Sequence, residues 1–247
     1  MGAPDMGEDG DARALVTLAS KVLAAAGQSD LIWGHVSVRD PGGRGAWLKA
    51  AGWGLEEIDE DRVVLVDPDG EVVEGDGPRH VECFIHTRVM AARHDVGCVV
   101  HTHAGASTAF ASLGVPLRPI SHEGALFVPP DVARFTGTSS LIRSADLGDQ
   151  LAKELGDRNA LLLPGHGVVV VGCDVPTAVM TAVLLDRACR LQLDVTAAGG
   201  PHVWTADDEA LEKRAMCWPP LQLESGWRYL VRRATGAEET AGGPSAA

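Results

Sequence analysis

Two histidines separated by one residue close an apolar stretch in the first half of the chain. His101 and His103 end the run GCVVHTH at 97–103. In a β-strand, residues i and i+2 point to the same face, so both imidazoles are expected on one side of a sheet, a few ångströms apart. Such a pair can bind one metal ion through a nitrogen of each ring. The alternative is a strand end whose imidazoles bond to backbone groups or to water.

A third histidine, His166, stands between two glycines inside the apolar stretch 160–172. Flanking glycines permit a sharp turn that presents the ring at the edge of a strand. Together with the first two histidines it would complete a three-imidazole site with open coordination positions, which is the arrangement of a catalytic metal. Glu82 is a fourth candidate ligand. Its place near the start of a helical pattern at 80–94 is also typical of an acid that complements the helix dipole.

Composition limits the classes of partner. The 247 residues include 21 Lys and Arg against 34 Asp and Glu, a net charge of −13, which argues against binding to nucleic acid or to an anionic membrane. No apolar run reaches the roughly 18 residues of a membrane span, and the N-terminus lacks the pattern of a secretory signal. The five cysteines are widely spaced and form no C-x-x-C. We therefore expect reduced core thiols and a cytoplasmic protein that acts on a small molecule.

Helices and strands that must position these residues alternate along the chain. Apolar residues at helical spacing predict helices at 11–28, 80–94, 104–114, 146–155 and 175–197, and a further helical stretch at 205–234 that breaks at Pro219-Pro220. Short, partly alternating segments predict strands at 35–40, 46–50 and 62–67, the valines of 97–103 predict a buried strand there, and 160–172 contains two apolar runs. This order predicts one α/β domain over residues 1–234, built on a central sheet and followed by a disordered tail at 235–247.

The order of these landmarks resembles the class II aldolase/adducin family. Gly-x-Val-Ser-x-Arg at 34–39 comes first, then Glu82, then His-Thr-His nineteen residues later, then Gly-His-Gly about sixty residues on. The likeness covers roughly residues 12–200. It implies a mixed central β-sheet flanked by helices, and a homotetramer with active sites between neighbouring subunits. It also implies one divalent ion per chain (zinc, manganese or iron) on His101, His103 and His166, with Glu82 as a further ligand or as the acid/base.

The chain departs from the sugar-phosphate aldolases of that family where those enzymes bind phosphate. His35 replaces the asparagine of their Gly-Asn motif, 49–53 replaces a turn with a small hydroxyl residue, and His80-Val81 replaces two serines. A phosphate dianion needs several converging N–H and hydroxyl donors. We therefore expect a substrate without phosphate.

Flat side chains that stand at or near these places favour an aromatic or heteroaromatic ligand. His35, His80 and Trp53 are the expected substrate-binding residues, and His122 joins them because family members have a strand beside the active site at 121–124. A core or subunit contact is the alternative for Trp53, and a surface position is the alternative for His122.

The predicted activity is that of a divalent-metal-dependent carbon–carbon lyase. Its leading form is decarboxylation of a hydroxylated aromatic or heteroaromatic carboxylate, since a branch of the family with Gly-His in this motif resembles such decarboxylases. The alternatives are an aldolase on a non-phosphorylated hydroxy-carbonyl compound, an Fe(II)-dependent oxygenase on the same scaffold, and an adducin-like binding module. Glu82 is expected to transfer the proton, with a pKa raised by burial. Tyr229 is the only tyrosine and hence the only candidate for a phenolic proton donor.

Overall fold

One eight-stranded sheet forms the centre of the molecule, whose computed structural model describes residues 12–236. The strand order is β4-β3-β2-β1-β5-β8-β7-β6, and neighbours run antiparallel except β6 and β7, which run parallel. The sheet is therefore mixed, as expected. Its strands are β1 (His35–Arg39), β2 (Ala46–Lys49), β3 (Val63–Val66), β4 (Val72–Glu74), β5 (Cys98–Thr102), β6 (Ala133–Arg134), β7 (Ala160–Leu163) and β8 (Gly167–Gly172).

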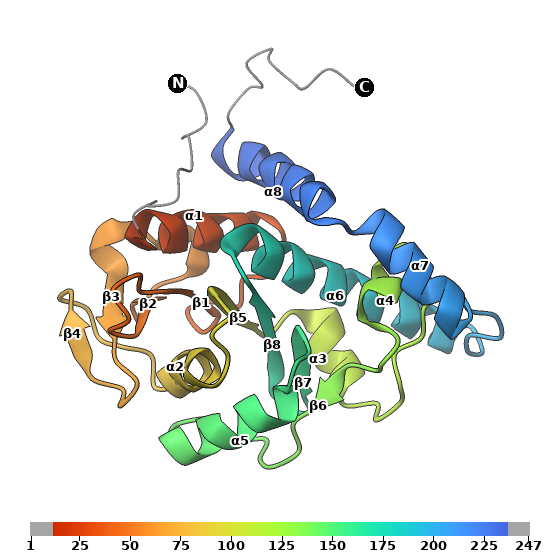
Figure 1. Cartoon of the computed structure of the whole chain (residues 1–247), viewed down its shortest axis with the longest axis horizontal. Coiled ribbons are helices and arrows are strands. Elements are labelled where there is room, and N and C mark those ends of the chain that lie inside the picture. Colours follow the sequence, from red (N-terminus) through yellow and green to blue (C-terminus); the bar gives the residue numbers. More distant parts are fainter. Residues whose placement is uncertain (1–11, 237–247) are drawn as a thin grey trace.

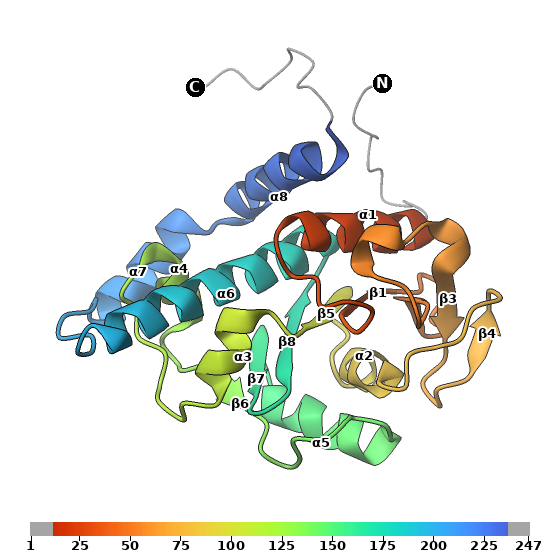
Figure 2. The same cartoon turned by 180° about the vertical axis from the view of Figure 1, so that it is seen from behind.

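Helices cover both faces of this sheet (Figures 1 and 2). Helices α1 (Ala12–Ala25) and α6 (Val175–Ala197) pack on one face, with α8 (Pro220–Thr235) against both of them. Helices α2 (Cys83–Ala92) and α5 (Ala145–Leu155) pack on the other face. The remaining helical segments are α3 (Gly105–Ala111), α4 (His122–Phe127), α7 (Asp207–Cys217) and the short 3-10 turns η1 (Leu55–Glu57) and η2 (Glu60–Arg62). The predicted single α/β domain is confirmed.

Side chains of β5 alternate between the two cores. Cys98 and Val100 pack in the core beneath α1 and α6, whereas Val99 packs in the core beneath α2 and α5. Burying a valine side chain stabilises the fold by about 1.5–3 kcal/mol, which fixes the register of this strand. By the same alternation His101 points to the face that α2 covers.

The strand expected at 121–124 is wrong, because this segment begins α4. Ser121 has an extended backbone, and its Oγ accepts the Gly124 N–H at 3.1 Å, which is the N-cap arrangement that starts a helix. At the other end of the chain Thr235 still belongs to α8, and Gly236 closes that helix in the left-handed conformation (φ 68°). Residues 237–247 of the expected tail lie outside the described part of the chain, as do residues 1–11.

Helices in the described range 12–236 are too short or too polar to cross a membrane. All five cysteines lie in this range and carry free thiols. Cys83, Cys98 and Cys189 are buried, as expected for core thiols, while Cys173 is exposed and Cys217 is half-buried. Burial raises the pKa of Cys98 and Cys189, which keeps these two thiols protonated and unreactive.

Candidate active site

Ends of three neighbouring strands bring the predicted ligands to one edge of the sheet. Strand β1 begins at His35, which pairs with His101 near the end of antiparallel β5. On the other side of β5, Thr102 pairs with Val168 near the start of β8. Since antiparallel neighbours start and stop at opposite ends, the start of β1, the end of β5 and the turn before β8 meet at one place. His166 lies in that turn.

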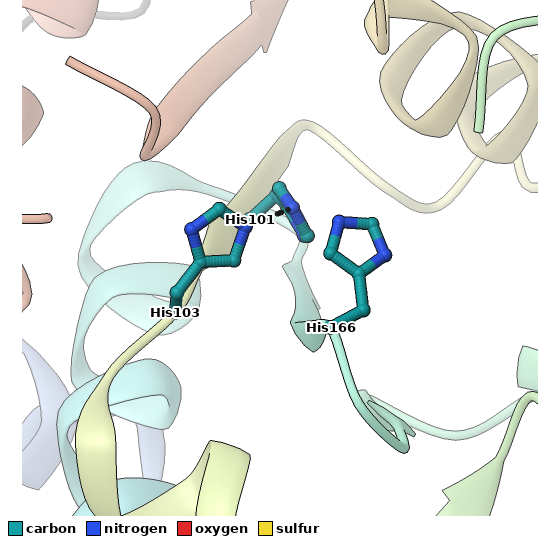
Figure 3. Close-up of side chains that lie close together, drawn as sticks. All are labelled: His101, His103 and His166. Carbon is teal, nitrogen blue, oxygen red and sulfur yellow. Dashed lines mark hydrogen bonds between the residues drawn. The ribbon is translucent and has the colours of Figure 1, made fainter. Parts of the chain in front are cut away.

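Three imidazoles face one another at this edge (Figure 3). His101 Nε2 and His103 Nε2 lie 3.1 Å apart, and the ring centroid of His166 lies 4.9 Å from that of His101 and 5.4 Å from that of His103. One ligand atom of each ring lies within 4.8 Å of the others. The structure thus brings together the three histidines that the sequence indicated.

The turn that carries His166 requires glycine on both sides of this residue. Gly165 has a φ of 74°, the left-handed region that other residues rarely adopt. At Gly167 a Cβ would lie 2.6 Å from Cδ2 of His103 and from the carbonyl oxygen of Thr102. A side chain at either position would disturb the turn that carries His166.

The hydrogen bonds of two of these rings leave their Nε2 atoms free for a metal. His101 Nδ1 donates to the carbonyl oxygen of Val168 at 2.9 Å, and His103 Nδ1 donates to the carboxylate of Asp30 at 2.8 Å. In a neutral ring the proton on Nδ1 leaves a lone pair on Nε2. Two lone pairs 3.1 Å apart repel each other unless a proton or a metal ion lies between them, and nitrogen ligands of a tetrahedral zinc lie about 3.3 Å apart. The donor set therefore fits a divalent ion, held in the pattern typical of metal-binding histidines.

Glu82 completes this group as an anion. It is the N-cap residue of α2, but its side chain does not cap that helix. Instead Oε1 accepts the Ile142 N–H at 2.8 Å and lies 3.4 Å from His166 Nε2, and Oε2 lies 3.8 Å from His101 Nε2. The carboxylate thus faces the site, as the functional interpretation requires.

The expectation of a raised pKa for Glu82 is wrong. Burial is the largest single influence and would raise this pKa, but the neighbouring His166 and His101 and the bond from Ile142 together lower it to about 2. Glu82 is therefore ionised at neutral pH and can accept a proton.

A second row of buried polar side chains adjoins the three imidazoles. His35 Nδ1 lies 2.6 Å from His86 Nε2, and His86 Nδ1 lies 2.7 Å from the hydroxyl of Ser37. The ring centroid of His35 lies 4.2 Å from that of His80 and 4.9 Å from that of His101. The row therefore connects the expected substrate-binding histidines to the candidate metal ligands.

Lys49, at the end of β2, terminates this row and is fully buried. Its Nζ donates to the carbonyl oxygens of Trp53 at 2.6 Å and Ile32 at 3.1 Å, and lies 3.5 Å from His80 Nε2. Burial lowers the pKa of Lys49 to about 8. Lys49 thus places a positive charge beside His80 at neutral pH and ties two loops that carry the half-exposed rings of Trp33 and Trp53.

Acid should unfold the metal-free protein through these buried rings. Burial lowers the pKa of His80 to about 4 and of His86 to about 3, from 6.5. Between these pKa values and pH 6.5 the two histidines bind protons in the unfolded chain but not in the folded chain. Their contribution to stability is therefore complete above pH 6.5 and is lost as the pH falls toward the folded-state pKa values. We expect the free energy of unfolding to be lower by about 2–3 kcal/mol per ring at about pH 4.5 than above pH 6.5. Urea titrations at pH 7.5 and 4.5 measure this; an unchanged midpoint would contradict it.

Asp30 should matter for metal affinity although it faces no ion itself. Its bond to His103 Nδ1 fixes the ring and its tautomer, and loss of such a partner typically lowers metal affinity about 10–100-fold. We therefore expect Asp30→Asn to weaken zinc binding by this factor in a competition with a chromophoric chelator. The matched control is Asp208→Asn, an exposed aspartate in the first turn of α7, which should leave the affinity unchanged.

The structure does not gather every predicted residue at this centre. The ring of His122 lies 3.4 Å from the Cys217 Sγ, on the α4–α7 side of the molecule. Tyr229 is half exposed on α8 and lines a cavity of about 340 Å³ that no histidine of the described residues borders. Trp53 is 37% exposed and stacks under the guanidinium of Arg62, 3.8 Å from its ring centroid. These three roles remain predictions.

Three residues of the site had no predicted role. Asp30 orients His103 through a hydrogen bond, His86 forms a hydrogen bond with His35, and Lys49 places its ammonium beside His80 at the end of the row. A lysine that ends an otherwise apolar strand, as in AWLKA at 46–50, was the only local signal. For the other two, the partner lies at least 51 residues away in the sequence.

The protein has an eight-stranded mixed sheet covered by helices, and three imidazoles and a carboxylate meet at one edge of this sheet. These features define an α/β protein of the class II aldolase type. Residues 14–193 match the family described as "Class II Aldolase and Adducin N-terminal domain", and the chain belongs to this family. The family is an enzyme superfamily that includes aldolases and decarboxylases.

Individual relatives differ in the activities that their names state. A 3,4-dihydroxyphthalate decarboxylase of Arthrobacter keyseri is 30% identical over 239 residues, 92% of this chain and 95% of that protein. A 4-hydroxy-3-prenylphenylpyruvate oxygenase/4-hydroxy-3-prenylbenzoate synthase of Streptomyces roseochromogenus subsp. oscitans is 32% identical over 69% of this chain and 62% of its own. Among solved structures, L-fuculose 1-phosphate aldolase from Glaciozyma antarctica shares the fold, with a TM-score of 0.81 at 23% identity over 95% of each chain.

Proposed function

We propose that this protein is a divalent-metal-dependent carbon–carbon lyase that decarboxylates a hydroxylated aromatic or heteroaromatic carboxylate. The observation that carries the proposal is the buried row of His35, His80 and Lys49. Its first member, His35, lies beside His101 of the three-imidazole centre, and Lys49 is its far end. Ring N–H groups and an ammonium suit a carboxylate next to a flat ring. The similarity to a 3,4-dihydroxyphthalate decarboxylase over nearly the whole of both chains supports the same reaction.

Each residue of the centre has a part in this reaction. His101, His103 and His166 would hold the ion, which supplies Lewis-acid stabilisation of the negative charge that develops as CO₂ leaves. When the carbon–carbon bond breaks, its electron pair stays on the ring carbon, which then needs a proton. Glu82, ionised in the free protein, accepts the proton of the substrate hydroxyl and delivers it to that carbon. His80 holds a carboxylate group of the substrate, and His35 does so only in the tautomer that protonates its Nε2, in which this nitrogen binds no ion.

Lys49 gives this binding a pH dependence. Its pKa of about 8 means that the ammonium is charged below this pH and neutral above it. Because a positive charge beside His80 favours a bound carboxylate, we expect KM for an aromatic dicarboxylate to rise as the pH increases from 7 to 9. The charge-retaining Lys49→Arg variant should lose this step in the KM profile. An equal rise in both proteins would contradict the assignment.

The reaction is tested by screening the purified, metal-loaded protein under nitrogen. Hydroxyphthalates, hydroxybenzoates and hydroxypyridine carboxylates are the compounds to screen, with CO₂ release as the readout. Release without oxygen supports a decarboxylase. Turnover that requires O₂ would overturn it in favour of an Fe(II)-dependent oxygenase, which the similarity to a Streptomyces oxygenase makes the second candidate. Cleavage of a hydroxy-carbonyl compound without CO₂ would instead indicate an aldolase.

The homotetramer expected for the family belongs to the same proposal. Leu31, Ile32 and Trp33 form three consecutive exposed apolar residues, and they follow directly after Asp30, which contacts the metal-site ring of His103. Such an apolar run beside the centre favours a subunit contact there. Light scattering of the purified protein measures the assembly, and Ile32→Glu should shift it toward smaller species.

A further inference from the structure

His35 shares one structural feature with two of the metal-site histidines. In His101 and His103 the Nδ1 atom is anchored by a hydrogen bond and the Nε2 atom faces the site. In His35 the Nδ1 atom is anchored by His86 at 2.6 Å. Its Nε2 atom is buried and has no hydrogen-bond partner among the described residues. A buried nitrogen without a partner costs free energy unless a ligand satisfies it.

The free atom of His35 has suitable neighbours for a cation. One ligand atom from each of His35, Glu82 and His101 lies within 4.8 Å of the others, and all three residues are buried. Two imidazoles and a carboxylate form a donor set that divalent transition metals accept. Register explains the arrangement, because His35 and His101 are paired residues of β1 and β5, and α2 supplies both the N-cap Glu82 and the anchor His86.

We infer that His35, Glu82 and His101 form a second, inner position for the divalent ion, beside the outer position of His101, His103 and His166. The inference rests on the proposed function only in requiring an ion at the centre, and it holds whatever reaction the ion supports.

The two positions must be alternatives rather than a two-metal centre. His101 belongs to both sets, and its Nδ1 proton is donated to the Val168 carbonyl, so the ring has one free nitrogen. One nitrogen lone pair binds one ion at a time. The protein should therefore bind one ion per chain, which the two donor sets can hold in turn.

Direct metal binding tests this without any turnover assay. A chain with His103→Ala and His166→Ala retains only the inner set, and we expect it still to bind one cobalt(II) or zinc ion per chain. Adding His35→Asn to this chain should weaken the binding at least about 10-fold. Adding His94→Ala, an exposed histidine outside the cluster, is the matched control and should leave it unchanged. Visible absorption of cobalt(II) and chelator competition for zinc report the binding, and circular dichroism reports the fold.

A milder background keeps the test informative if the double variant does not fold. Apart from its ionic contact with Glu82 at 3.4 Å, His166 has no polar partner on either ring nitrogen among the described residues, so His166→Ala removes the ligand and this one contact. In this background His35→Asn should weaken zinc binding about 10-fold more than it does in the natural chain. Equal effects in both backgrounds, or a folded double variant without metal, would overturn the inner position. If the natural chain itself binds no ion, the metal-dependent function fails as well.

Discussion

Replacing His101, His103 and His166 together by alanine is expected to abolish binding of the divalent ion and, with it, turnover. The change removes every imidazole of the outer donor set and the ring that an inner set would share. The natural chain should carry about one ion and the triple variant none above background, as measured by elemental analysis after gel filtration.

Thermal unfolding gives an independent readout of the same change. An ion that binds only the folded chain stabilises it by about 4 kcal/mol at a thousandfold excess over its Kd. Added zinc should therefore raise the Tm of the natural protein but not that of the triple variant. Replacement of the exposed His94 and His202 by alanine is the control and should keep both the ion and the shift. A triple variant that retains a full complement of metal would show that the centre lies elsewhere.

Local sequence patterns predicted the fold class, most of the helices and strands, and the three histidines, but not β4, β6 or α4. Partly alternating apolar residues predicted β1, β2 and β3, and a run of valines predicted β5, because each strand buries one or both faces. The side chains of His101 and His103 fall on one side because a strand has a period of two. The glycines beside His166 predicted its turn, because one of them adopts a positive φ and the other lies against β5.

Partners that are distant in the sequence explain what the patterns missed. The bond between His35 and His86 joins residues 51 positions apart, and that between Asp30 and His103 joins residues 73 apart. No spacing rule relates such residues before the sheet register is known. The pKa of Glu82 was mispredicted for the same reason: burial is visible in a sequence pattern, but the approach of His166, His101 and the Ile142 N–H to the carboxylate depends on the folded chain.

Glu82→Gln is expected to keep the ion and to lower kcat about 10²–10⁴-fold, the usual contribution of a positioned acid/base group. Glutamine has the same shape, and its amide oxygen can still accept the Ile142 N–H, so the helix start and the three imidazoles should stay in place. What it loses is the negative charge, which the natural residue carries at neutral pH because its pKa is about 2. An amide can neither accept the proton of a substrate hydroxyl nor return it to carbon.

The distribution of the loss between kcat and KM identifies the role of Glu82. If Glu82 transfers the proton, the substrate still binds and KM changes little while kcat collapses. If the carboxylate serves only as a ligand, the metal content falls along with the activity, and excess metal restores turnover. Glu82→Asp retains the charge on a shorter side chain and should recover part of kcat. Full activity of Glu82→Gln at unchanged metal content would remove this residue from the reaction and leave the proton to a group such as Tyr229, which lies on α8 outside the cluster of histidines.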